Sequence, residues 1–153
     1  MCYKKVLIIE IYKNHNKNYK QTVFIQCMQK KYISVDVETS GLTPGKYSML
    51  SLGACVVGDI EKNFYRELKP LNNNYILEAM KIGCLGLNCL VLKKYPELNP
   101  KNDQFNPQKV LSVLQEEGEE PKKVMADYED WILKNTKGFR PIEVAAPIKF
   151  DGM

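Results

Sequence analysis

The stretch YISVDVETSGL, from Tyr32 to Leu42, decides the fold because it combines a strand pattern with two closely spaced acids. Its β-branched residues alternate with Ser34, Asp36 and Glu38, and alternation with a period of two predicts a β-strand. A strand places Asp36 and Glu38 on the same face, with their Cα atoms about 6.5 Å apart. The sequence therefore predicts a strand with one apolar face and one acidic face.

Two carboxylates at this spacing favour a divalent cation between them. They repel each other, and they lose hydration on burial unless a cation compensates. Carboxylate oxygens are the hard ligands that Mg²⁺ and Mn²⁺ prefer. A solvated strand face that leaves Asp36 and Glu38 exposed is the alternative. For the two acids alone we favour that alternative, because short motifs match by chance.

The four residues after the strand add chemistry that suits a nucleic acid. Thr39 and Ser40 supply hydroxyls and Gly41 supplies flexibility, so the loop can offer hydroxyl and backbone N–H groups to a phosphate. Leu42 is a lone apolar residue that would contact a base. A place in the hydrophobic core is an equally good interpretation of Leu42.

The middle of the chain predicts a hairpin and a helical segment. Residues 49–68, MLSLGACVVGDIEKNFYREL, indicate two strands joined by a turn at Gly58-Asp59. Residues 75–95, YILEAMKIGCLGLNCLVLKKY, are apolar and mostly helical in pattern, with interruptions expected near Gly83 and Gly86.

The last third predicts two more helices and a strand. Residues 96–121 are rich in proline, asparagine and glutamate, so we expect a surface excursion with a helix over 107–117. Residues 121–135 place an apolar stripe on one helical face, at Val124, Tyr128, Trp131 and Ile132. The sequence RPIEVAAPIKFD, residues 140–151, then returns to strand. This order of strands and helices predicts an α/β domain.

Composition limits the class of protein. The chain has 153 residues, 44% hydrophobic and 26% charged, which suits one globular domain. No apolar run approaches the ~18 residues that span a bilayer, and Glu10 interrupts the only signal-like segment. We therefore expect a cytoplasmic protein with no membrane contact. The five cysteines form no CxxC pair, which favours buried free thiols over a zinc site.

The basic charge is concentrated at the N-terminus. Residues 1–31 hold seven lysines and one acid, giving +6, and the remaining residues hold 15 basic and 17 acidic side chains, giving −2. The net charge of +4 is thus poor evidence for nucleic-acid binding by the whole chain. We divide the chain into a basic N-terminal extension, residues 1–30, and a domain over residues 31–153.

Two motifs together resemble the DEDD family of 3'-5' exonucleases, in its DEDDh branch. That family includes RNase T, oligoribonuclease and the proofreading subunit of bacterial DNA polymerase III. VDVETSGL resembles its first motif. VAAPIKFD fits the frame of its second, hydrophobic-A-H-N-x-x-F-D, with agreement at Ala145, Phe150 and Asp151. Ala146 and Pro147 replace the usual histidine and asparagine.

The resemblance implies a fold, a reaction and roles for the residues. The fold would be ribonuclease H-like, a mixed sheet with three antiparallel strands flanked by helices and with the last helices missing. Asp36, Glu38 and Asp151 would hold two Mg²⁺ or Mn²⁺ ions for hydrolysis at the 3' end of single-stranded DNA or RNA. Thr39, Ser40, Gly41 and Leu42 would hold the terminal nucleotide. A homodimer is left open.

The sequence also departs from this family. A fourth acid and a histidine normally follow the second motif on a further helix, whereas here the only histidine, His15, precedes the first motif. We therefore expect a C-terminally truncated, incomplete exonuclease domain with little or no activity, because general base catalysis typically contributes ~10²–10⁴-fold.

Three other interpretations stay open. The first is a catalytically inactive nuclease-like module that binds a nucleic-acid end. The second is another ribonuclease H-like phosphotransferase that cleaves internal sites. The third is an interaction protein in which both motifs are coincidental. Salt-dependent binding without turnover would favour the inactive module. Cleavage at internal sites would favour the phosphotransferase, and absence of metal binding would favour the interaction protein.

Overall fold

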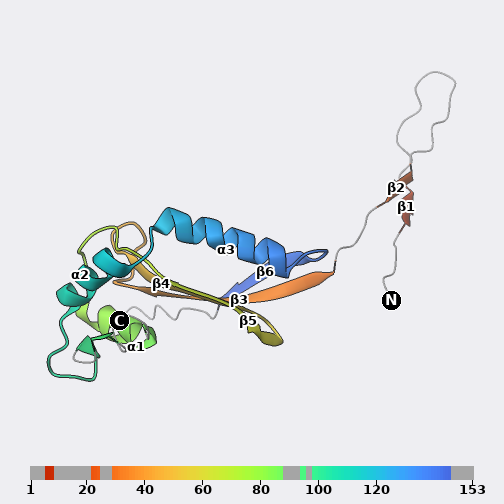
Figure 1. The fold of residues 1–153 in the computed structure, drawn as a ribbon. Coiled ribbons are helices and arrows are strands. Elements are labelled where there is room, and N and C mark those ends of the chain that lie inside the picture. Colours follow the sequence, from red (N-terminus) through yellow and green to blue (C-terminus); the bar gives the residue numbers. More distant parts are fainter. Residues whose placement is uncertain (1–5, 9–21, 25–28, 88–93, 96–97, 146–153) are drawn as a thin grey trace, which may run out of the picture.

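The computed structural model describes residues 6–8, 22–24, 29–87, 94–95 and 98–145. Its helices and strands follow one another along the chain as drawn in Figure 1. They are β1 (Val6–Ile8), β2 (Thr22–Phe24), β3 (Lys30–Thr39), β4 (Met49–Val56), β5 (Asp59–Glu67), α1 (Leu77–Gly86), α2 (Pro107–Glu117), α3 (Pro121–Asn135) and β6 (Arg140–Ala145).

The main sheet has four strands in the order β5-β4-β3-β6. β3 pairs antiparallel with β4 and β4 pairs antiparallel with β5, whereas β6 runs parallel to β3. The predicted α/β class is therefore confirmed: a mixed sheet with an antiparallel three-strand part is flanked by helices. This arrangement is compatible with a ribonuclease H-like fold. β1 and β2 form a separate antiparallel pair.

One face of the sheet is apolar because of the alternation in β3. Ile33 is fully buried and belongs to a core cluster that includes Val124 and Tyr128 of α3. Figure 1 shows α3 lying along this face. The predicted apolar stripe of α3 is confirmed, since Trp131 and Ile132 also pack against the cluster. The same alternation directs the polar residues of β3 to the opposite face.

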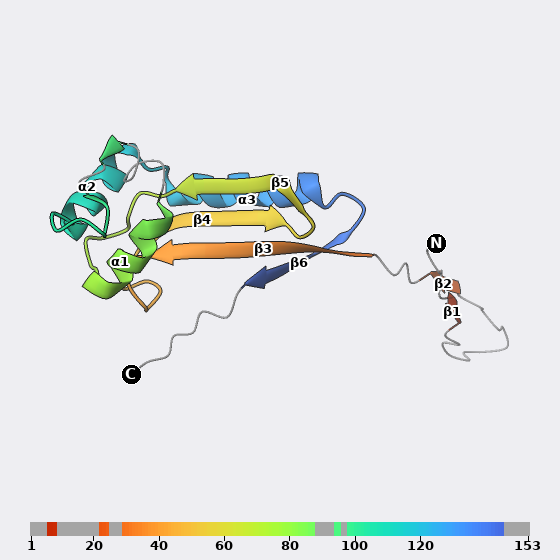
Figure 2. The ribbon, with the colours of Figure 1, turned by 90° about the horizontal axis from the view of Figure 1, so that it is seen from below.

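A second core cluster joins α1 and α2 at the end of the sheet where β3 finishes (Figure 2). Leu111 and Leu114 of α2 and Met80 of α1 are buried there. The prediction that residues 96–121 form a surface excursion is therefore wrong for α2. Its bounds, Pro107–Glu117, are those that the sequence predicts, and the side chain of Asn106 caps it by accepting from the Lys109 N–H.

Two local predictions need correction. The hairpin turn consists of Val57 and Gly58, one residue earlier than predicted, because Gly58 adopts a positive φ of 86° and Asp59 already pairs with Val56. α1 continues through Gly83 and ends at Gly86, so Gly83 does not interrupt it. Among the described residues, the structure contains no helix of a length and hydropathy that would cross a membrane.

Candidate active site

The two acids of β3 lie on the sheet face opposite α3. Asp36 is paired with Gly53 and Glu38 with Ser51, so both side chains are directed to one face by the regular register. Asp36 is exposed and Glu38 is half-buried. β5, which is separated from β3 by β4, adds Tyr65 and Glu67 to this face, and the Tyr65 hydroxyl donates a 2.8 Å hydrogen bond to Glu67 Oε1.

Glu38 is packed against the last turn of α1. A Cβ built on Gly86 would lie 2.9 Å from Glu38 Oε1, and one built on Gly83 would lie 3.3 Å from Oε2. Burial against this turn, followed by repulsion from Asp36, raises the pKa of the Glu38 carboxyl to about 7. The site thus holds a carboxylate that is costly to ionise without a compensating cation.

Cys84 of α1 is buried near the same carboxylate. Burial first, and the charge of Glu38 second, raise the pKa of its thiol to about 12. A thiol must be deprotonated to act as a metal ligand. Cys84 is therefore a buried free thiol, as the sequence predicts.

The residues after β3 are held in place by hydrogen bonds within the protein. The Thr39 hydroxyl donates to the Gly41 carbonyl at 2.9 Å. The Ser40 hydroxyl is buried, donates to the Asn74 carbonyl at 2.8 Å and accepts from the Ser48 N–H at 3.0 Å. These bonds close the loop of residues 40–48 and tie it to the segment before α1. Ser40 therefore shapes the loop, and its hydroxyl points inward.

Gly41 is required by close packing within the same loop. A Cβ at this position would lie 2.5–2.7 Å from three ring atoms of Tyr47. We expect Gly41→Ala to destabilise the chain by about 1–3 kcal/mol, as overpacking typically does, and the double variant Gly41→Ala/Tyr47→Ala to recover part of the loss. Urea unfolding measures both. Thr43→Ala, an exposed change in the same loop, is the control, and a Gly41→Ala midpoint equal to wild type would contradict the packing argument.

Leu42 lies at the rim of an apolar hollow. The side chain is 54% exposed, which excludes a place in the core. The hollow has a volume of about 330 Å³ and is lined by Val37, Thr39, Leu42, Tyr47, Met49 and Leu71 among others. Because Val37 alternates with the two acids along the regular part of β3, its side chain enters this hollow from the side of the strand opposite the carboxylates, whereas the register of β3 shifts between Glu38 and Thr39.

The strand of the second motif lies directly beside the strand of the first. In the parallel β3–β6 ladder, Ala145 pairs with Val35, the residue before Asp36. Tyr128 of α3 fixes β6 by donating a 2.8 Å hydrogen bond to Glu143. The two motifs are thus brought together as far as Ala145. Asp151, the third predicted acid, lies outside the described residues, and so do Phe150 and His15.

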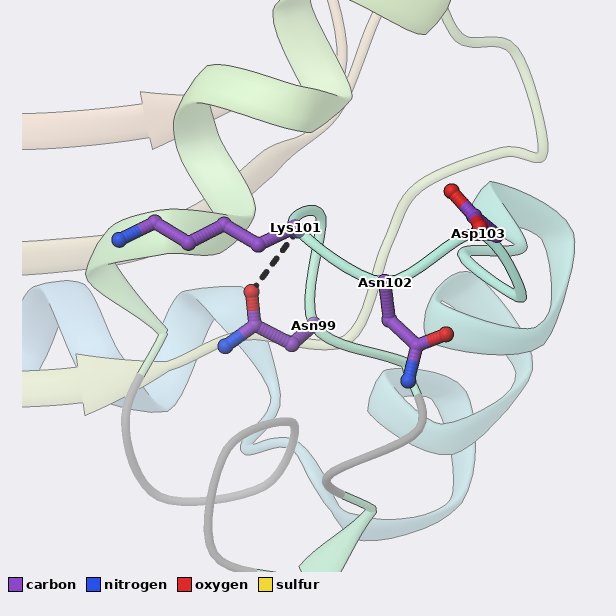
Figure 3. Close-up of a pocket in the computed structure, with 4 residues that line it drawn as sticks. All are labelled: Asn99, Lys101, Asn102 and Asp103. Atoms are coloured by element: carbon purple, nitrogen blue, oxygen red, sulfur yellow. Dashed lines mark hydrogen bonds between the residues drawn. The ribbon is translucent and has the colours of Figure 1, made fainter.

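The described part of the chain contains no group of three or more His, Cys, Asp or Glu side chains with metal-binding geometry. Among the described residues, Asp36 and Glu38 are therefore a pair of carboxylates on one face and not part of a larger group of this kind. A second hollow, of about 370 Å³, lies in the loop before α2 (Figure 3). It is lined by Asn99, Lys101, Asn102 and Asp103, and the Lys101 N–H donates to Asn99 Oδ1. These four residues are those of an ordinary polar surface loop, so we assign no role to this hollow.

Sequence reasoning missed the contact between Glu38 and the two glycines of α1. Glycine in a helical pattern is usually interpreted as a break. The available signal was their spacing, because residues three apart share one helix face. Tyr65 and Glu67 were also missed, although their spacing of two on one strand would have placed them together.

Comparison with known proteins gives one informative similarity. No protein-family model matches the chain. Part of the chain is 52% identical, over 59 residues, to the 3'-5' DNA exonuclease Cap18 of Escherichia coli. The aligned part is 39% of this chain and 32% of that protein, so the match spans about a third of the relative's length. This similarity supports a relationship to exonucleases.

Proposed function

We propose that this chain carries the metal-binding face of a 3'-5' exonuclease that hydrolyses phosphodiester bonds at single-stranded DNA ends. The observation that carries the proposal is the pair Asp36 and Glu38 on one sheet face, with Glu38 packed against the last turn of α1. The partial similarity to a 3'-5' DNA exonuclease supports the same reaction and favours DNA over RNA.

The electrostatics of the site favour a cation. Gly83 to Gly86 form the last turn of α1, and the carbonyls of a last turn have no partners within the helix. The C-terminus of a helix carries about half a negative charge. Glu38 is therefore close both to the charge of Asp36 and to this helix end, so that a divalent cation would relieve both repulsions.

The residues of the first and second motifs fit a DEDD-type metal centre. Asp36, Glu38 and Asp151 would hold two Mg²⁺ or Mn²⁺ ions, and carboxylate oxygens suit both metals. The ions, when bound, would neutralise charge on the phosphate and on the leaving oxygen. The acids of the chain would fix where this positive charge lies, and the charge would in turn attract and orient the scissile phosphate. Asp36 is exposed, so a cation bound to it would be accessible to the phosphate.

The loop after β3 would hold the terminal nucleotide. Leu42 is exposed at the loop surface and presents an apolar side chain that would contact a base. Thr39 and Ser40 act through the hydrogen bonds that fix the loop, and Gly41 acts through its packing on Tyr47. A cytoplasmic location and a homodimer stay predictions from the sequence.

We expect the 153-residue chain by itself to trim DNA slowly or not at all, because its sequence supplies three of the four expected acids and no histidine after Asp36. A missing general base typically lowers the rate by ~10²–10⁴-fold. A 3'-labelled oligonucleotide with Mn²⁺ tests this. Any weak trimming should disappear in Asp36→Asn, and robust trimming that depends on Asp36 would contradict the expected low rate while supporting the reaction.

A nucleic-acid-binding module without catalysis is the second candidate. The replacement of the second motif's usual histidine and asparagine by Ala146 and Pro147 favours it. Fluorescence anisotropy with a single-stranded oligonucleotide distinguishes the two. Salt-dependent binding that is unchanged by Mn²⁺ and by Asp36→Asn would favour the module.

A further inference from the structure

We propose that Gly83 and Gly86 of α1 are positioning residues for Glu38. Together they form a seat, defined by these two glycines, that fixes where the carboxylate of Glu38 meets a divalent cation. The inference deepens the proposed function and rests on it, since the purpose of the seat is to hold a metal ligand. The seat itself is a feature of the metal-free protein and has its own test.

The two glycines face the two oxygens of one carboxylate. A Cβ on Gly86 would be 2.9 Å from Glu38 Oε1, and a Cβ on Gly83 would be 3.3 Å from Oε2. Residues three apart lie on the same face of a helix, so the glycines form one continuous contact surface. The carboxylate therefore rests against the helix through both oxygens, which restricts its rotation as well as its position.

The backbone does not explain why glycine occupies these positions. The described glycines with positive φ are Gly45, Gly58 and Gly138, and neither glycine of the seat is among them. Within a helix, glycine is disfavoured relative to alanine. The contact with Glu38 supplies the missing reason, because alanine at either position would crowd the carboxylate. The crowding is greater at Gly86, where the distance is below that of real Cβ contacts.

A methyl group at position 86 would displace the carboxylate and leave the helix in place, because the far end of Glu38 is the flexible partner. Metal–ligand distances tolerate deviations of only about 0.2 Å. Residues that orient a ligand typically change metal affinity 10–100-fold when they are altered. Displacing Glu38 by a few tenths of an ångström should therefore weaken metal binding without removing a ligand.

The first test measures Mn²⁺ binding to the 153-residue chain by electron paramagnetic resonance. We expect Gly86→Ala to lower the affinity about 10–100-fold, and Gly83→Ala to lower it less, in the order of the two distances. Ile82→Ala is the matched control, since Ile82 lies on the same helix and is 69% exposed. Its affinity should equal that of wild type.

The second test measures thermal unfolding without metal, so it does not depend on the proposed function. Gly86→Ala should lower Tm when residue 38 is glutamate. It should raise Tm in a Glu38→Ala background, where the methyl meets no carboxylate and the better helix propensity of alanine remains. Equal shifts of Tm in the two backgrounds would overturn the seat.

The outcomes separate the two proposals. Mn²⁺ binding that depends on Asp36 but is unchanged in Gly86→Ala overturns the positioning role alone. Absence of Mn²⁺ binding in the wild type overturns the proposed function, and with it the positioning role, while opposite shifts of Tm would still show the contact. A weakened affinity in Gly86→Ala together with opposite shifts of Tm in the two backgrounds supports the seat.

Discussion

Asp36→Asn is expected to abolish measurable Mn²⁺ binding by the chain. Asparagine keeps the size of the side chain and one oxygen, so the change isolates the loss of negative charge. Asp36 is exposed, and its replacement should therefore leave the fold intact. Substitution of a residue that only orients a metal ligand typically lowers metal affinity about 10–100-fold. Removal of a charged ligand itself should therefore lower Mn²⁺ affinity by more than about 100-fold. Calorimetric titration with Mn²⁺ measures the loss.

The matched control for this charge removal is Asp59→Asn. Asp59 is on β5 and forms an ion pair with Lys62. Asp59→Asn changes the net charge by the same amount as Asp36→Asn, but its Mn²⁺ affinity should equal that of wild type. Binding of Mn²⁺ should also raise Tm of the wild type, because a ligand of the native state stabilises it by mass action. An equal rise in Asp36→Asn would mean that the acid pair is not the cation site.

The regular elements could be predicted because their signals are local. The alternation of β3 places Ile33 and Asp36 on opposite faces whatever the neighbouring strands are. α2 begins with Pro107 at its first position and has Asn106 as its cap, and both signals are contained in a few residues. For these elements, tertiary contacts agree with local preference, which is why the strand is where the alternation predicts it and the bounds of α2 match.

Features that depend on contacts between distant residues could not be predicted. The composition of residues 96–121 is that of a loop, yet Leu111 and Leu114 bury themselves against α1. The glycines of α1 are helix breakers by propensity, and only the approach of Glu38, more than forty residues earlier, gives them a role. The same limit applies to the pairing of Val35 with Ala145, which places the start of the second motif beside β3.

Glu38→Gln is expected to make the metal-free chain more stable than wild type at pH 8, while removing its metal binding. The pKa of Glu38 rises from 4.5 to about 7 in the fold, through burial first and Asp36 second. Between these values the native state binds more protons than the unfolded state, so stability falls as the pH rises. Glutamine does not titrate, so the free energy of unfolding of Glu38→Gln should depend less on pH over this range.

The difference between Glu38→Gln and wild type should therefore be small near pH 4.5, grow up to about pH 7, and stay constant above it. Urea unfolding at a series of pH values measures the difference. Asp36→Asn should show part of the same gain, because it removes the second cause of the raised pKa. Saturating Mn²⁺ should reverse the order of stability of the two proteins at pH 8, since only the wild type then gains binding free energy.

A wild type that is more stable than Glu38→Gln at pH 8 without metal would mean that the Glu38 carboxylate is stabilised by the protein itself. In that case the acid pair would need no cation, and the electrostatic argument for a metal site would fail.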